Sequence, residues 1–183
     1  ALTSRLIKRL KYKTATAAAI FAAAMSVCCT SCNTITDDAL PALPVNINLS
    51  PVSVWNTYGV TAFGSYRYFV MQNGEPSGFP YIGQSATGFG GVLLVCGFNP
   101  YTTDAGVPMA YDLACPVERR AEVRVRMKAT DTFPMAVCPE CGSTYNVVEH
   151  GGAPESGPAA ASRLGLTRYR CLDAVNGGYL IIN

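Results

Sequence analysis

Short apolar runs, interrupted at close intervals by glycine and proline, constrain the fold of this chain more than any other feature. All 17 glycines and ten of the 12 prolines follow Val45, and no stretch of this region keeps the 3.6-residue repeat of an amphipathic helix. Glycine and proline end regular elements, so such a pattern favours short strands joined by turns. We therefore expect residues 45–183 to form one all-β domain, since 183 residues suffice for one ordinary domain.

Several segments carry recognisable strand patterns. Residues 45–49 alternate apolar and polar side chains, and residues 91–98 form the continuous apolar run of a strand that is buried on both faces. Residues 121–128 alternate apolar with basic side chains, which predicts a strand with one charged face. The sequence Asn-Gly-Gly at 176–178 predicts a tight turn that leads into a last strand at residues 179–182.

The first 31 residues have the composition of a secretory signal. Five basic residues and no acidic one lie in the first 13 positions, and residues 14–27 form an apolar run that is too short to span a bilayer comfortably. Thr30-Ser31 before Cys32 resembles the lipobox of bacterial lipoproteins, although that motif usually has leucine where this sequence has Cys29. The resemblance implies a signal peptide over residues 1–31, lipidation of Cys32 and a linker over residues 32–44.

This reading implies a protein that is exported and lipid-anchored in the bacterial cell envelope, on the periplasmic or the surface side. A plain signal peptide and an uncleaved anchor are the alternatives. Without residues 1–31 the chain has nine basic and 12 acidic residues, so it lacks the basic face that nucleic-acid binding requires.

The sequence offers little for catalysis. His150 is the only histidine, which excludes any site that needs two histidine ligands from one chain. A turn-like setting favours an exposed turn residue over a ligand at His150, although His150 stays a candidate for an additional metal ligand. No Ser-His-Asp set, glycine-rich phosphate loop or pair of carboxylates stands out. We therefore favour a role other than that of an enzyme, and a role as an electron-transfer component stays open.

Five cysteines follow Cys32, and an odd number in an exported chain leaves at least one without a disulfide partner. The sharpest motif is Cys138-Pro139-Glu140-Cys141-Gly142, in which two cysteines can direct their sulfurs at one metal ion. The glycine lets backbone amides approach those sulfurs. A lone pair of this spacing also occurs in iron–sulfur sites, redox dithiols and disulfides, and Cys115-Pro116 forms a second cysteine–proline corner.

The order of these motifs resembles the Rieske iron–sulfur family. The resemblance rests on Tyr111-Asp112-Leu113-Ala114-Cys115-Pro116, Cys138-Pro139-Glu140-Cys141-Gly142-Ser143-Thr144-Tyr145, Gly151-Gly152, Ser156-Gly157-Pro158-Ala159 and Leu164 to Tyr169. These segments look like the first cluster loop, the second cluster loop, the proline-containing loop and the closing strands of that family. With the signal segment, the chain looks most like the exported Rieske-like lipoproteins of Bacteroidetes-type bacteria.

The resemblance implies a Rieske-like antiparallel β sandwich with two cysteine-containing loops at its tip. It also implies a [2Fe-2S] cluster, single-electron transfer, and partners that are the membrane and a redox or envelope protein. The ligand pattern departs from the family, which uses Cys-x-His in the first loop and Cys-x-x-His in the second. Cys115 and Cys138 match the cysteine ligands, but Val117 and Cys141 stand at the histidine positions. Valine cannot ligate, so a standard Cys2His2 centre is excluded.

Three outcomes stay open for Cys115, Cys138 and Cys141. They hold a three-thiolate cluster or a zinc site that Glu118, His150 or another cysteine completes. Alternatively, they belong to a cluster-free, disulfide- or zinc-stabilised module of the envelope. The third outcome is dithiol redox chemistry, which needs a cysteine of lowered pKa.

Two further cysteines lie in strand-like surroundings. Cys96 follows Val95 in the apolar run, and Cys171 follows Arg170. Each is expected to be a buried small hydrophobic residue, with a disulfide between Cys96 and Cys171 as the alternative.

Overall fold

The computed structural model describes residues 34–99 and 104–183, and Ile35–Asn183 form one compact unit. The predicted signal segment at residues 1–31 and the predicted lipidation site at Cys32 lie outside the described residues. No helix among the described residues is long and apolar enough to cross a membrane.

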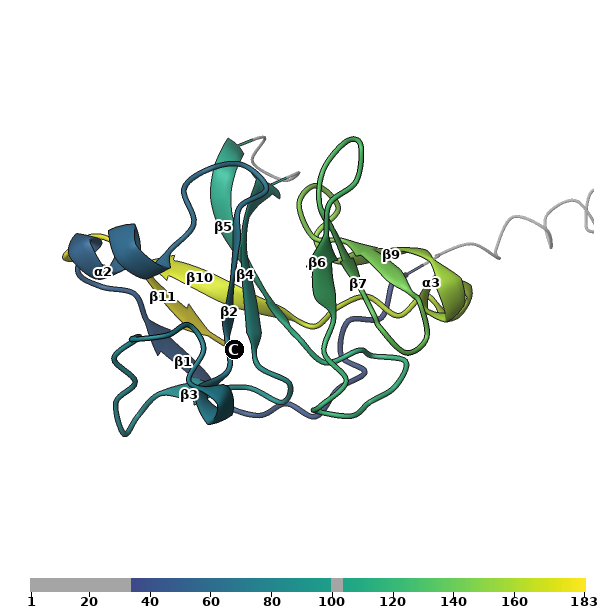
Figure 1. Ribbon diagram of the computed structural model, residues 1–183, viewed down its shortest axis with the longest axis horizontal. Coiled ribbons are helices and arrows are strands. Elements are labelled where there is room, and N and C mark those ends of the chain that lie inside the picture. Colours follow the sequence, from purple (N-terminus) through teal and green to yellow (C-terminus); the bar gives the residue numbers. More distant parts are fainter. Residues whose placement is uncertain (1–33, 100–103) are drawn as a thin grey trace, which may run out of the picture. The chain divides into compact units, whose positions relative to one another are not determined.

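Antiparallel strands dominate the compact unit, which confirms the all-β prediction (Figure 1). One sheet has the strand order β2-β4-β5-β10-β11-β1-β3. Its strands are β1 (Val45–Asn48), β2 (Tyr66–Phe69), β3 (Ala86–Thr87), β4 (Val92–Asn99), β5 (Asp104–Asp112), β10 (Arg168–Asp173) and β11 (Tyr179–Ile182). The second sheet contains β6 (Arg126–Lys128), β7 (Met135–Val137), β8 (Thr144–Asn146) and β9 (Ala153–Ser156) in chain order. The helical elements are α2 (Val52–Tyr58), the short 3-10 helix η1 (Met71–Asn73) and α3 (Gly157–Ser162).

Strand β4 is buried on both faces and separates two hydrophobic cores. Leu93 and Val95 join the core shared with the second sheet, whereas Val92 and Leu94 join the core shared with β1 and β11. All four side chains are fully buried, and burying a side chain of this size stabilises the fold by about 1.5–3 kcal/mol. Figure 1 shows β4 and β5 between the strands that supply these two cores.

Most of the strand predictions are confirmed. Residues 45–49 contain β1 and residues 91–98 lie almost wholly in β4. The predicted hairpin joins β10 to β11, and its turn is closed by the amide of Ala174, which donates to the carbonyl of Gly178 at 3.0 Å.

Residues 121–128 form a shorter strand than expected. Only their last part is strand β6, because the preceding residues pair with the first cysteine loop. The amide of Val125 donates to the carbonyl of Leu113 at 2.8 Å, and the amide of Cys115 donates to the carbonyl of Val123 at 3.0 Å. Val123 and Val125 are nevertheless buried, as the alternation predicts.

Two segments differ from what the sequence predicts. The proline-containing loop begins helix α3. Its first turn accommodates Pro158 because an amide hydrogen at that position would have no acceptor within the helix. Residues 35–44, expected as part of a linker, belong to the compact unit. The carbonyl of Thr36 accepts from the amide of Gly165 at 2.8 Å, and Leu40 is buried. The packed unit therefore begins at Ile35 rather than at Val45.

Candidate metal centre

Two cysteine–proline turns of the same backbone conformation lie at the centre of the candidate site. The amide of Arg119 donates to the carbonyl of Cys115 at 2.9 Å, and the amide of Gly142 donates to the carbonyl of Cys138 at 3.1 Å. Arg119 and Gly142 also share the left-handed conformation, with φ of 52° and 70°. A proline follows each cysteine and fixes the φ angle at the corner of the turn. The two turns are therefore structural equivalents.

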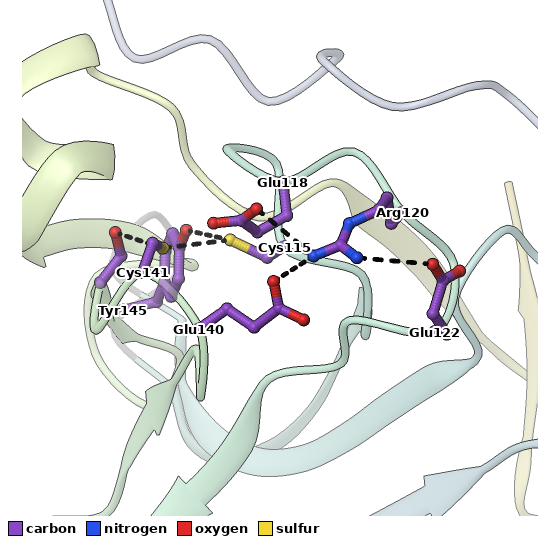
Figure 2. A network of polar contacts seen from close by, with 8 residues as sticks. Cys115, Glu118, Arg120, Glu122, Glu140, Cys141 and Tyr145 are labelled. Atoms are coloured by element: carbon purple, nitrogen blue, oxygen red, sulfur yellow. Dashed lines mark hydrogen bonds and ion pairs between the residues drawn. The ribbon is translucent and has the colours of Figure 1, made fainter.

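This equivalence matches the residues of the two turns position by position. Cys141 lies three residues after Cys138, and Glu118 lies three residues after Cys115. Glu118 thus takes the place in the first turn that Cys141 takes in the second. The side chain of Glu118 is 24% exposed, and its carboxylate lies 3.7 Å from a guanidinium nitrogen of Arg120 (Figure 2).

Three sulfur atoms converge between the turns. The Sγ atoms of Cys115, Cys138 and Cys141 all lie within 4.8 Å of one another, and those of Cys115 and Cys141 are 3.7 Å apart. Cys115 and Cys138 are buried, and Cys141 is partly exposed. Zinc binds thiolates at about 2.3 Å, which places the sulfurs of a tetrahedral site about 3.8 Å apart. The three sulfurs are therefore close enough to bind a single ion.

Buried hydroxyl groups surround the sulfurs. The Tyr145 hydroxyl lies 3.4 Å from the Sγ of Cys115, and the Ser143 hydroxyl lies 3.1 Å from the Sγ of Cys141. Ser143 also accepts a hydrogen bond from the amide of Ala159 at 3.0 Å. Its own proton therefore remains available for a Cys141 thiolate.

The sulfurs differ in acidity because their surroundings differ. Burial raises the pKa of the Cys138 thiol well above its ordinary value, although the amides of Cys141 and Glu140 donate to its sulfur. Burial acts to raise the pKa of Cys141, but hydrogen bonds from the Ser143 hydroxyl and amide, together with those from the Cys138 and Cys115 thiols, outweigh it and lower that pKa. Cys141 therefore ionises at lower pH than Cys138 in the metal-free protein.

A network of charged side chains borders the sulfur site, and Figure 2 shows the Arg120 guanidinium between three carboxylates. Arg120 pairs with Glu140 of the second turn, and its nitrogens lie 3.7 Å from Glu118 and 3.9 Å from Glu122. The network joins the two turns, and its excess of negative charge favours a cation at the site.

The other residues singled out in the sequence lie elsewhere. His150 is exposed, and its Nδ1 lies 2.8 Å from Oε1 of Glu155. Neither it nor Glu118 belongs to the group of three cysteines. Cys96 on β4 is fully buried as expected, whereas Cys171 on β10 is only partly buried because it lies where β10 has left the edge of β5; both are free thiols. The alternative prediction, a disulfide between Cys96 and Cys171, stays a prediction.

Ser143 and Tyr145 are site residues that the sequence reasoning missed, although both lie in the second-loop motif. The available signal was the alternation of side chains after the turn at Gly142. Residues two apart in a strand point to the same face, so Ser143 and Tyr145 would lie on one side. Both side chains are fully buried beside the sulfurs.

The chain's residues do not fit a two-iron cluster of the Rieske type. Such a cluster divides four protein ligands between two irons. Val117 offers no ligand atom, and the three sulfurs lie as close together as ligands of one ion do. Comparison with protein families, curated proteins and solved structures yields no match to this chain.

Proposed function

We propose that this domain binds one zinc or iron ion through Cys115, Cys138 and Cys141, with Glu118 as the fourth ligand. The observation that carries the proposal is the pair of equivalent cysteine–proline turns whose three sulfurs lie within 4.8 Å of one another. Thiolates select soft ions such as zinc and iron, and zinc also accepts a carboxylate oxygen beside sulfur.

The proposed ion links two parts of the chain that are distant in sequence. Cys115 follows β5 in the large sheet, whereas Cys138 and Cys141 lie between β7 and β8 in the small sheet. Four protein ligands make a closed site, which is typical of a structural metal rather than a catalytic one. With this ion bound, the domain would be a binding or structural module in which the metal cross-links the two cysteine turns.

The Rieske-like interpretation becomes a proposal about ancestry and redox chemistry. Two neighbouring cysteine turns beside a small antiparallel sheet support it. With iron in the site, three thiolates would support single-electron transfer at a potential below that of a histidine-containing Rieske centre. The proposed lipid on Cys32 would keep the domain at a membrane of the cell envelope, near a redox or structural partner protein.

A second candidate is a metal-free module that a disulfide stabilises. The distance of 3.7 Å between the Cys115 and Cys141 sulfurs favours it, because a small approach would bring them to bonding distance. An exported protein meets oxidising conditions in which such a bond persists. Cys138 would then remain a free thiol, whereas the metal-bound form needs all three cysteines reduced.

Cobalt(II) titration of three variants tests the metal proposal, because tetrahedral thiolate coordination gives cobalt an intense visible absorption. We expect one cobalt ion per chain in the wild type and loss of the thiolate band in Cys138→Ser. Glu118→Gln should weaken binding by about tenfold or more, as loss of a ligand or its direct support does. Glu122→Gln is the matched control, since Glu122 belongs to the same charged network but is 70% exposed.

Two results would contradict the proposal. Equal cobalt affinity and an equal spectrum in the wild type and Cys138→Ser would exclude the three-thiolate site. Equal behaviour of Glu118→Gln and Glu122→Gln would exclude Glu118 as the fourth ligand and leave the three thiolates in place.

A further inference from the structure

The large sheet forks between β5 and β10. These strands form only two residue pairs, Arg168 with Tyr111 and Tyr169 with Ala110. Beyond the second pair, β5 stays paired with β4 on its far edge, and β10 stays paired with β11. Figure 1 shows β5 and β10 running in clearly different directions. Each strand therefore continues past the fork with one edge lacking a strand partner among the described residues.

Pro108 stands at the position where the ladder ends. Two residues beyond the Tyr169 and Ala110 pair, the register would place Cys171 opposite Pro108. The amide of Asp112 donates to the carbonyl of Thr167, so Ala110 and Pro108, two and four residues earlier, also turn their backbone groups toward β10. Proline has no amide hydrogen, and a ladder that reaches it loses a donor.

The open edge of β10 retains both donors and acceptors. Arg170 and Leu172 direct their backbone groups toward β11, as does Ala174, whose amide donates to Gly178 in the hairpin. By alternation, the amides and carbonyls of Cys171 and Asp173 point toward the fork. This edge is a short template for another strand.

A groove of about 680 Å³ occupies the fork. Its walls include Pro108 and Met109 from β5, and Cys171 and Asp173 from β10. Three carboxylates and two guanidinium groups line it, so its charges are nearly balanced. A strongly anionic or cationic ligand gains little from such a lining, whereas a neutral polypeptide backbone matches the open strand edge.

We propose that the fork binds an extended peptide segment of a partner protein, which adds to the sheet along the Cys171–Asp173 edge of β10. Main-chain hydrogen bonds would supply the affinity, and the side walls would select alternate side chains of the peptide. The proposal does not depend on a metal in the cysteine site.

A library of random nine-residue peptides displayed on phage provides the probe, with the full chain as bait. The enriched peptide is then synthesised with free amides and with N-methyl groups on alternate amides. In an added strand, every second amide of the peptide faces β10. We expect N-methylation of that set to abolish binding, because it blocks the hydrogen bonds to β10. Bound peptide should also slow alkylation of Cys171 and amide exchange at Asp173. The fully buried Cys96 should stay unreactive with and without peptide, which shows that the chain remains folded during the assay.

Asp173→Pro and Asp173→Asn form a matched pair of variants. Proline removes the amide hydrogen that faces the fork, which β11 does not use, and it also fixes the φ angle and removes the carboxylate that contacts Tyr179. We expect at least tenfold weaker peptide binding. Asparagine keeps that amide and should bind as the wild type does. Circular dichroism and cobalt binding report whether Asp173→Pro remains folded.

Three results would overturn the proposal. They are an absence of enrichment over a bait-free control, equal binding of the peptide when either alternating set of amides is methylated, and equal binding to the two Asp173 variants when both are folded. Self-association that protects the amides of Cys171 and Asp173 without peptide would also overturn it, because a second copy would then fill the fork.

Discussion

Replacing Asp112 by asparagine should destabilise the domain, because its buried carboxylate organises the approach to the first cysteine turn. One oxygen accepts from the amide of Ala114 at 2.7 Å and from that of Gly90 at 3.0 Å. The other accepts from the amide of Phe89 at 3.0 Å and from the hydroxyl of Tyr169 at 2.5 Å. Asp112 is 1% exposed, so water cannot replace a lost acceptor.

The expected loss is about 2 kcal/mol. Asparagine keeps one oxygen for two of the donors, but its amide nitrogen faces the other two. Tyr169 can rotate its hydroxyl to accept, which leaves the Phe89 amide without a partner. A buried donor without an acceptor costs about 1–3 kcal/mol, and the remaining hydrogen bonds weaken when the charge is removed. For a unit of this size the melting temperature should fall by about 4–8 °C.

Urea unfolding followed by tryptophan fluorescence measures the change, since Trp55 is the only tryptophan. Asp131→Asn is the control, because Asp131 is exposed and its replacement should change the free energy of unfolding by less than about 0.5 kcal/mol. A change as small as this in Asp112→Asn would refute the reasoning.

Three further predictions concern the cysteines. Ser143→Ala removes the hydroxyl that lowers the pKa of Cys141, so the midpoint of Cys141 alkylation in metal-free protein should move to higher pH; an unchanged midpoint would contradict this. Metal affinity should rise with pH by up to three log units per pH unit, because three thiols lose protons on binding; competition titrations from pH 6 to 8 would show a flat profile if the thiolates are not the ligands. Cys96 should react with a disulfide reagent only after unfolding, because it is fully buried and burial raises its pKa; prompt reaction in the folded chain would disagree with the structure.

Features with a local signal were predictable from the sequence. Strand β4 appears as an unbroken apolar run because both of its faces are buried, and the last hairpin appears through its Asn-Gly-Gly turn. The meeting of Cys115, Cys138 and Cys141 was one of the outcomes that the motif order indicated. Paired cysteines and glycine-containing turns are recognisable within a few residues of sequence, so their prediction does not require the tertiary fold.

Features that depend on tertiary contacts were not predictable. The equivalence of Glu118 and Cys141 rests on a left-handed backbone at Arg119, and arginine gives no sign of that conformation. Thr36 lies in a stretch with the composition of a linker, yet it pairs with Leu164, far away in sequence. Helix α2 has only seven residues, too few for a helical repeat to show.

The metal content of the full chain tests the central claim most directly. Zinc and iron per chain would be measured by elemental analysis after purification without oxygen, together with a count of free thiols. We predict one zinc or iron ion per chain, released together with the appearance of three reactive thiols when a chelator is added. Absence of both metals even after incubation with equimolar zinc, with Cys115 and Cys141 joined in a disulfide, would contradict the metal site and favour the metal-free module.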